Sequence, residues 1–225
     1  MADVRVATVD DRDLLVRIGA EGFYADPVLS WVFPDDATRL DRLLLTFGDL
    51  VDDFVPERGT VHLADGACAA FWREPGFSSI TTAASRAEAD EGPSVLSEDE
   101  LQRLAILGAA MEAHHPHETH WYLNVVSTLP PRQSQGLGTA VLQPVLAQAD
   151  ADGVPCYLES TNPRNRTLYY RHGFEDLREI PLEGGPSMLA MWREPVLQRV
   201  SDRKAKAATT LAAAEILELR DLDRR

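Results

Sequence analysis

Apolar residues recur at helical spacing in several stretches of the first half of the chain. Residues 14–18, 29–33 and 38–54 each place their large apolar side chains three or four positions apart, which predicts three helices. A fourth helix is expected after Ser97, because Ser97 and Glu100 form a capping-box pair ahead of a run of leucines. The intervening residues 77–96 are small, polar and acidic, and predict an irregular insertion.

Strand patterns are interspersed with these helices. Residues 4–8 alternate between apolar and polar types, and two apolar runs, 61–63 and 67–72, flank Asp65-Gly66, which is a strong hairpin signal. The segment 121–128 is rich in aromatic and β-branched residues and predicts a buried strand. These patterns predict a chain in which helices and strands are mixed throughout.

The second half of the chain continues this alternation. A helix is expected from Gly138 to about Asp152, with Pro144 bending it because proline cannot donate the helical hydrogen bond. Short strands follow at 157–159, 174–180 and 187–192. No internal repeat is visible.

Composition narrows the class of protein. The chain has 225 residues and a net charge of −14, which predicts one domain, or one domain with an extension, and argues against nucleic acid as a partner. Acidity is compatible with attracting a cationic amine, although solubility explains it as well. Cys68 and Cys156 lie in apolar runs and are expected to be buried free thiols. Since neither a secretory signal nor a membrane-spanning run is present, a cytoplasmic protein without membrane contact is expected.

The turn after the strand 121–128 has the composition of an anion site. Two prolines end the strand, and Gly136 and Gly138 open the next helix, so free backbone N–H groups and the positive end of a helix dipole meet there. The Walker pattern fails because Gly138 is not followed by Lys and Ser or Thr, and the dinucleotide pattern fails because Val141 replaces its third glycine. The spacing that fits is Q-x-x-G-x-G, starting at Gln133.

This spacing closely resembles the pyrophosphate-binding loop of the GNAT acetyltransferase superfamily, whose members hold acetyl-CoA there. A second block, Asn165 to Phe174, resembles that superfamily's later half, with Tyr169 four residues before a Gly-Phe pair. Two further features are shared, Trp72 with its neighbours and the pair His115-Pro116. With them, the closest resemblance is to the puromycin-acetyltransferase-like branch, which is common in bacteria. The resemblance covers residues 1–195 and implies an α/β (α+β) fold. Its central sheet is expected to be mixed and mostly antiparallel, with about six or seven strands, splayed in the middle and flanked by helices.

The resemblance implies which residues hold the thioester carrier. Backbone groups near the end of the central strand should pair with the pantetheine arm, and backbone N–H groups of the loop should bind the diphosphate, while Asn165 should bond the arm or, alternatively, merely cap its helix. The implied cofactor-binding residues are Val126, Ser127, Thr128, Gln133, Ser134, Gln135, Gly136, Leu137, Gly138, Thr139 and Asn165.

The resemblance also implies the catalytic groups. Tyr169 matches the tyrosine that protonates the departing CoA thiolate, although a tyrosine there could simply pack. Glu159, on the strand opposite the central one, is the candidate general base, although it could equally be an ion-paired acid at a strand end, with water carrying the proton.

Candidate residues for the acceptor pocket are mainly aromatic. They are Phe23, Tyr24, Asp26, Trp31, Trp72 and Trp121, with Glu21 as a further carboxylate that could bind the amine; each aromatic could instead belong to the core. The histidines between His114 and His120 suggest a metal, but Pro116 prevents a helical ligand pair and no cysteine lies near, so no metal is expected.

The resemblance therefore implies an acetyl-CoA-dependent N-acetyltransferase that moves an acetyl group to a primary amine of a small molecule, such as an antibiotic, aminonucleoside or metabolite, by direct attack in a ternary complex. Two alternatives stay open, acetylation of protein N-termini or lysines, and a non-catalytic acyl-CoA-binding module. Residues 196–225 are rich in alanine and mixed charges, which predicts a helical tail that is frayed, docked on its own domain or in contact with a partner. The chain could be a monomer or a homodimer.

Overall fold

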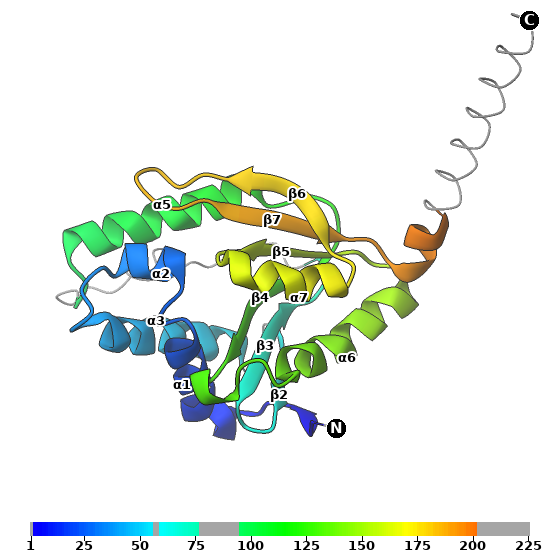
Figure 1. The fold of residues 1–225 in the computed structure, drawn as a ribbon, viewed down its shortest axis with the longest axis horizontal. Coiled ribbons are helices and arrows are strands. Elements are labelled where there is room, and N and C mark those ends of the chain that lie inside the picture. Colours follow the sequence, from blue (N-terminus) through cyan, green and yellow to red (C-terminus); the bar gives the residue numbers. More distant parts are fainter. Residues whose placement is uncertain (1, 56–58, 77–94, 202–225) are drawn as a thin grey trace, which may run out of the picture.

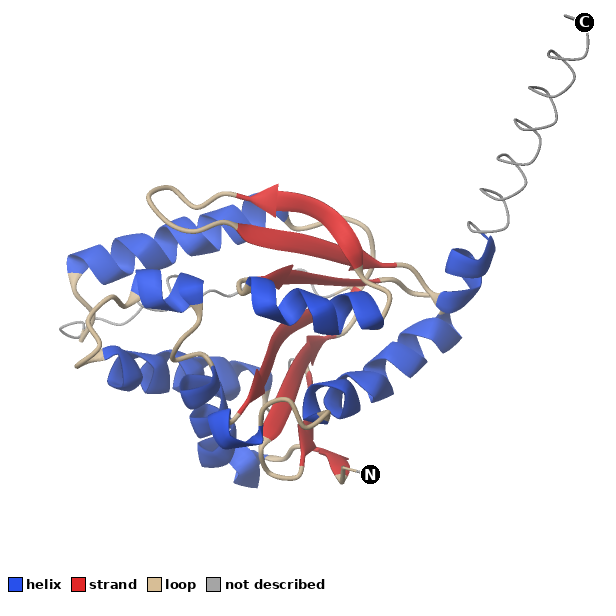
Figure 2. Ribbon diagram, in the orientation of Figure 1, coloured by secondary structure: helices blue, strands red, loops and turns tan. Residues whose placement is uncertain are grey.

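A seven-stranded sheet forms the centre of the molecule, with strand order β1-β2-β3-β4-β5-β7-β6 and helices on both faces (Figures 1 and 2). The computed structural model describes residues 2–55, 59–76 and 95–201. The strands are β1 (Val4–Val6), β2 (Thr60–Ala64), β3 (Cys68–Arg73), β4 (Trp121–Thr128), β5 (Cys156–Ser160), β6 (Glu175–Ile180) and β7 (Met188–Arg193). All neighbours are antiparallel except β4 and β5. The predicted fold class is confirmed.

Apart from α7, the helices occur where the sequence patterns predict them. Their bounds are α1 (Arg12–Gly22), α2 (Pro27–Val32), α3 (Arg39–Phe54), α5 (Glu98–His114), α6 (Leu137–Asp152) and α7 (Arg166–Arg171), with 3-10 turns η1 (Val9–Asp11), η2 (Pro130–Arg132) and η3 (Pro163–Asn165). The predicted capping box at the start of α5 is confirmed, because Ser97 Oγ accepts from the Glu100 N–H and the Glu100 carboxylate accepts from the Ser97 N–H.

The central feature of the sheet is the separation of β4 from β5. Only two pairs, Trp121 with Cys156 and Tyr122 with Tyr157, join these parallel strands. Beyond them the strands run apart (Figure 1). On the other side of β4 the ladder with β3 continues to Thr128, interrupted by a bulge at Asn124. Within the described part of the chain, the backbone groups of β4 that face β5 after Tyr122 therefore have no strand partner.

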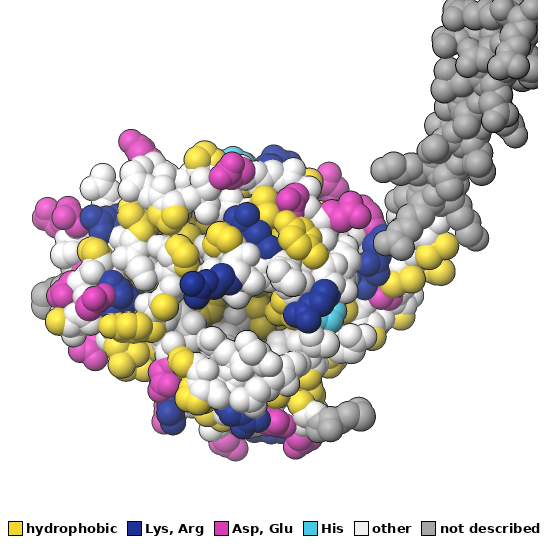
Figure 3. All heavy atoms as spheres, in the orientation of Figure 1, with side chains coloured by type: hydrophobic (Ala, Val, Ile, Leu, Met, Phe, Trp, Pro, Cys, Tyr) yellow, Lys and Arg dark blue, Asp and Glu magenta, His cyan; other side chains and the backbone are white. Residues whose placement is uncertain are grey.

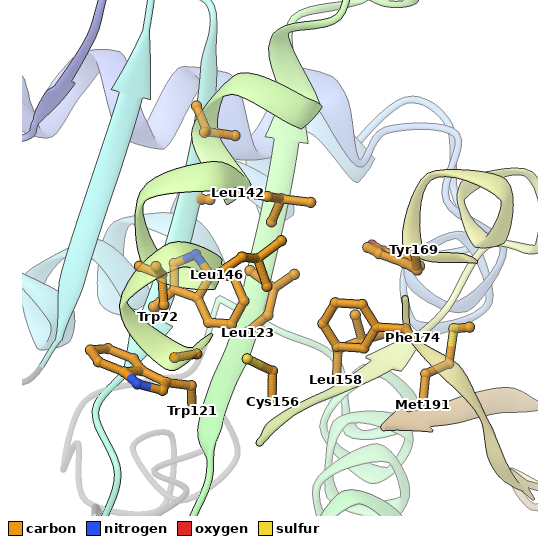
Figure 4. Close-up of a cluster of buried hydrophobic side chains, with 14 of the residues drawn as sticks. Trp72, Trp121, Leu123, Leu142, Leu146, Cys156, Leu158, Tyr169, Phe174 and Met191 are labelled. Atoms are coloured by element: carbon orange, nitrogen blue, oxygen red, sulfur yellow. The ribbon is translucent and has the colours of Figure 1, made fainter. Parts of the chain in front are cut away.

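Alternation along the strands divides the core between the two faces. Helices α6 and α7 pack on one face against side chains such as Trp72, Leu123 and Leu158 (Figure 4). Helices α1, α3 and α5 pack on the opposite face against β2 and β3, and α2 and α5 cover Tyr122 and Tyr157 there.

Two sequence predictions fall largely outside the described residues. These are the insertion at 77–96 and the tail at 196–225, of which residues 196–201 are described and are helical.

Cys68 and Cys156 are buried free thiols, as expected. Burial raises the pKa of the Cys68 thiol to about 11 and that of the Cys156 thiol to about 12. In the part of the chain that is described, no helix combines the length and apolar character needed to cross a bilayer.

Candidate active site

A cavity of about 650 Å³ opens where β4 and β5 separate. Its walls come from the end of β4, the loop into α6, the start of α7 and the turn between α1 and α2. Most residues predicted to hold a thioester carrier line it, together with two predicted acceptor-site residues. The predicted residues in the lining are Phe23, Asp26, Val126, Ser127, Thr128, Gln133, Ser134, Gly136, Leu137, Gly138, Thr139 and Asn165.

The loop into α6 has the backbone shape of an anion cradle. Ser134 (φ 60°) and Gly136 (φ 82°) both adopt the left-handed conformation, and Gly136 is the N-cap of α6. Successive N–H groups in such a turn converge on one point, where the helix dipole adds positive potential. A Cβ added to Gly136 would meet nothing within 4 Å, so space for a ligand is present beside this backbone.

The side chains of the two glutamines of the loop bond to nearby backbone carbonyls. Gln133 Nε2 donates to the Thr128 carbonyl at 3.1 Å, and Gln135 Nε2 donates to the Pro131 carbonyl at 3.1 Å. Their side chains therefore brace the loop, and Gln135 does not line the cavity.

Basic side chains surround this part of the cavity. Arg132, Arg164 and Arg171 line it, and Figure 3 shows basic groups around a hollow in the middle of this face. In a chain with net charge −14, such local concentration of positive charge favours an anionic ligand at this place. Sequence reasoning missed these arginines, although Arg132 and Arg164 each follow a proline in turns that flank the two family motifs.

The end of β4 presents its backbone to the cavity while its side chains are engaged elsewhere. Ser127 Oγ donates to the Ile18 carbonyl of α1 at 2.7 Å, and Thr128 Oγ1 donates to Cys68 Sγ at 3.1 Å. At Gly22 the end of α1 approaches this strand so closely that an added Cβ would lie 2.1 Å from Ser127 Oγ. The Ser127 and Thr128 side chains are thus engaged away from the cavity, and backbone use of these residues stays a prediction.

Tyr169 extends from α7 toward the side of β4 (Figure 4). It is 6% exposed, packs against Phe174 at 6.0 Å between ring centroids, and is buried next to the lining residue Leu168 instead of lining the cavity itself. Burial and the neighbouring Asp26 carboxylate raise the pKa of its phenol, which keeps it protonated at neutral pH. By contrast, Tyr170 is 47% exposed and donates to Asp176 at 2.7 Å.

Asp26 lines the cavity but has no free oxygen to offer. Its Oδ1 accepts from the Val28 and Leu29 N–H groups as the N-cap of α2, and its Oδ2 accepts from Thr161 Oγ1 at 2.6 Å. Burial raises its pKa. Asp26 therefore ties α2 to the end of β5 and fixes one wall of the cavity.

Glu159 lies on the opposite face of β5 from Leu158 and does not line the cavity. Its side chain is 3% exposed, and Oε1 lies 3.8 Å from His115 Nδ1. The hydroxyl groups of Tyr122 and Tyr157 face the carboxylate; burial, followed by this negative charge, raises the pKa of both phenols. Glu159 stands two residues beyond the last β4–β5 pair, so its side chain lies at the level where the strands part.

The predicted aromatic wall is only partly present. Phe23 lines the cavity, but Tyr24 donates to the Asp36 carbonyl and Trp31 Nε1 donates to the Gly184 carbonyl. The prediction fails for Trp72 and Trp121, which are 0% and 9% exposed and belong to the core between the sheet and α6. Alternation along β3 and β4 turns both rings to the α6 face.

Asn165 and the histidines before β4 were both singled out in the sequence. The Asn165 side chain makes no capping hydrogen bond, so this residue does not cap α7 through its amide and stays available to the cavity. The histidines before β4 pack against aromatic rings, with His115 4.9 Å from Tyr122 between ring centroids. Among the described residues, no group of three or more His, Cys, Asp or Glu side chains is arranged to hold a metal ion.

Comparison with known proteins agrees with this geometry. The model of the acetyltransferase (GNAT) family matches residues 61–174. An uncharacterized N-acetyltransferase of Schizosaccharomyces pombe is 30% identical over 101 residues, which are 41% of this chain and 38% of that protein, so the chain spans well under half the length of this relative.

Solved structures share the fold over most of the chain. A structure described as histone acetyltransferase HPA2 and related acetyltransferase, from Corynebacterium glutamicum, has a TM-score of 0.64 and 27% identity, covering 87% of this chain and 97% of that one. A mosquito arylalkylamine N-acetyltransferase like 5b has a TM-score of 0.59 and 13% identity, covering 86% and 100%. The family match contains β4, the loop into α6 and α7, which form most of the cavity wall, but not the turn between α1 and α2. This chain therefore belongs to the GNAT acetyltransferase family and is an acyltransferase enzyme.

Proposed function

We propose that the enzyme transfers an acetyl group from acetyl-CoA to a primary amine of a small molecule by direct attack in a ternary complex. The observation that carries this proposal is the meeting, in one cavity, of an unpaired strand edge, an anion cradle and a basic rim. These three features match the amide-rich arm, the diphosphate and the further phosphate of a CoA thioester.

The residues around the cavity fit such a ligand. The N–H groups from Ser134 to Thr139 would bind the diphosphate, and Arg164 and Arg171 would supply further positive charge. Unpaired backbone groups of Val126 to Thr128 would pair with the pantetheine arm, and Asn165 would bond the same arm from α7. A β4 N–H near the bulge would hold the thioester oxygen as negative charge develops.

Acid and base would come from opposite faces of the parted strands. Tyr169 would protonate the departing thiolate, which requires a phenol that is protonated at neutral pH, as burial ensures here. Glu159 would take the proton from the acceptor ammonium, because its carboxylate lies at the level where β4 and β5 separate.

The proposed acceptor is defined only by its chemical class, a small molecule with a primary amine. The mosquito neighbour is described as an arylalkylamine N-acetyltransferase, which makes a small amine a reasonable first substrate to test. Resemblance to the puromycin-acetyltransferase-like branch supports an antibiotic, aminonucleoside or metabolite amine. Phe23 and the α1–α2 turn would contact its apolar part.

The proposed function is tested by titrating the protein calorimetrically with acetyl-CoA and then measuring thiol release with a panel of small amines and lysine peptides. Binding together with release that depends on a small amine is the expected result. Thiol release with lysine peptides alone would favour protein acetylation. Acetyl-CoA binding without thiol release for any acceptor would favour a non-catalytic module.

The role of Glu159 makes a separate prediction. Glu159→Gln keeps the shape of the side chain but removes its basicity, so kcat should fall about a hundredfold while acetyl-CoA affinity stays close to that of the parent. The dependence of kcat on pH should also shift, because the carboxylate that accepts the proton is gone. A variant with parental kcat at every pH would remove Glu159 as the base.

A further inference from the structure

The Glu159 carboxylate is isolated from water on the α5 face of the sheet. Its side chain is 3% exposed, and Oε1 is buried without a hydrogen-bond partner among the described residues. A buried base that accepts a proton in each turnover must pass that proton on before the next one. The groups around Glu159 therefore decide whether it can act repeatedly.

His115 is the neighbour that connects this carboxylate with the surface. Its Nδ1 lies 3.8 Å from Glu159 Oε1 and is likewise buried without a hydrogen-bond partner in the described part of the chain. The His115 side chain as a whole is 19% exposed. Because Nδ1 itself is buried, the exposed part of the side chain lies on its other atoms, which places His115 between the carboxylate and solvent.

Aromatic rings hold His115 in this orientation. Tyr122 from β4 and Tyr157 from β5 meet its ring edge-on, both at an interplanar angle of 84°, with centroids 4.9 Å and 5.2 Å away. The hydroxyl of Tyr122 also accepts a hydrogen bond from Asn124 Nδ2 at 3.3 Å, which fixes it beside the bulge of β4. The separation of 3.8 Å is longer than a hydrogen bond, and a small rotation of the Glu159 side chain would close it.

The other ionisable groups near Glu159 are poor proton carriers. Tyr122 and Tyr157 keep their protons at neutral pH, since burial raises the pKa of both phenols. His120, from the loop before β4, is 8% exposed and its Nδ1 is already bonded to the Glu118 carbonyl at 2.6 Å. From β6 the charge of Arg178 acts on Tyr157, and an arginine side chain does not release its proton.

We propose that His115 is a positioning residue that takes from Glu159 the proton removed from the acceptor and releases it to solvent. This inference rests on the proposed function. The primary ammonium gives one proton to the Glu159 carboxylate, which passes it to the His115 imidazole and then to water. As the C–N bond forms and the C–S bond breaks, a second proton leaves the nitrogen by the same path. Tyr169 protonates the sulfur and regains its proton from water, so one proton is released per amide formed.

The first test compares His115→Gln and His115→Ala with the matched control His117→Gln, which changes an exposed histidine of the same loop. Both His115 variants should lose on the order of tenfold in kcat, with acetyl-CoA affinity near that of the parent. The melting temperature should stay near that of the parent in His115→Gln and fall in His115→Ala, which leaves the space of the ring empty. Added imidazole should restore turnover in His115→Ala, because it fits the space of the missing ring, and should have no effect on the control. Parental kcat in His115→Gln, or a loss that imidazole does not relieve in His115→Ala, would overturn the proposal.

A double-mutant cycle separates this role from a purely structural one. If His115 acts through Glu159, adding His115→Gln to Glu159→Gln should cause no further loss of kcat. Multiplied losses would overturn the relay and leave acetyl transfer intact. Failure of the parent to release thiol with every amine would instead overturn the proposed function, and the relay with it.

Discussion

Two adjacent tyrosines on α7 have different surroundings and therefore different expected roles. Tyr169 faces the core and the cavity wall, whereas Tyr170 faces solvent and bonds Asp176. Tyr169→Phe should therefore lower kcat on the order of a hundredfold with little change in acetyl-CoA affinity, because only the transferable proton is lost. Tyr170→Phe is the matched control and should keep parental turnover. Loss of acetyl-CoA binding in Tyr169→Phe would mark its hydroxyl as structural.

The two left-handed glycines at the ends of α6 allow the anion cradle to be tested by single substitutions. Gly136→Ala and Gly153→Ala both place a side chain at positive φ (82° and 67°) with nothing within 4 Å of the new Cβ, so each should cost about 1 kcal/mol of stability. Only Gly136 lines the cavity. Calorimetry should show acetyl-CoA binding weakened about tenfold in Gly136→Ala and unchanged in Gly153→Ala. Equal affinities in the two variants would argue against a diphosphate at this turn.

At the scale of elements, the turn η3 and helix α7 supply two of the three arginines that line the cavity. Arg164→Gln combined with Arg171→Gln should weaken acetyl-CoA binding and reduce its dependence on salt, because phosphate–arginine attraction is screened by added ions. Arg17→Gln on α1 removes an exposed arginine that does not line the cavity, and should leave both quantities unchanged. A salt dependence that persists in the double variant would contradict this role of the two arginines.

The elements themselves follow from local sequence patterns. The 3.6-residue spacing in α3 and α5, the capping box at Ser97 and the glycines around α6 all act within a few residues, so the sequence alone indicated them. The cavity loop was predicted in the same way, since the Q-x-x-G-x-G spacing from Gln133 to Gly138 lies within a few residues.

Features that depend on distant contacts were not predictable in this way. Trp72 and Trp121 could face either layer of the sheet, and only packing against α6 decides that they are core residues. Asp26 looked like a free acid, but Thr161, at the far end of β5, uses its second oxygen. The approach of His115 to Glu159 likewise depends on the fold and has no local sequence signal.

For the whole molecule, buried histidines predict how stability depends on pH. Burial lowers the pKa of His62, His120 and His172 below 6.5 in the folded state. The unfolded chain therefore binds more protons than the folded one as the pH falls below about 6.5, so the free energy of unfolding should decrease with acidification. The raised pKa of Asp26 acts in the opposite direction at lower pH.

Urea unfolding at pH 7.5, 6.5 and 5.5 measures this dependence. His62→Gln should flatten the decline, because burial is the cause of its lowered pKa and the substitution removes the titrating group. His117→Gln, an exposed histidine, should leave the decline as it is in the parent. Stability that is constant or increases between pH 7.5 and 5.5 would contradict the expectation.

The two-pair junction between β4 and β5 also has a consequence for cooperativity. Strands β1–β4 and β5–β7 share one packed core under α6 and α7, but main-chain bonding joins them through only two residue pairs among the described residues. A CoA thioester seated between them would add main-chain hydrogen bonds to both and act as a temporary part of the sheet. Deuterium exchange should then slow in β5 and β7, far from the phosphates, as well as in β4, because occupancy of the cleft would extend the main-chain bonding across the junction.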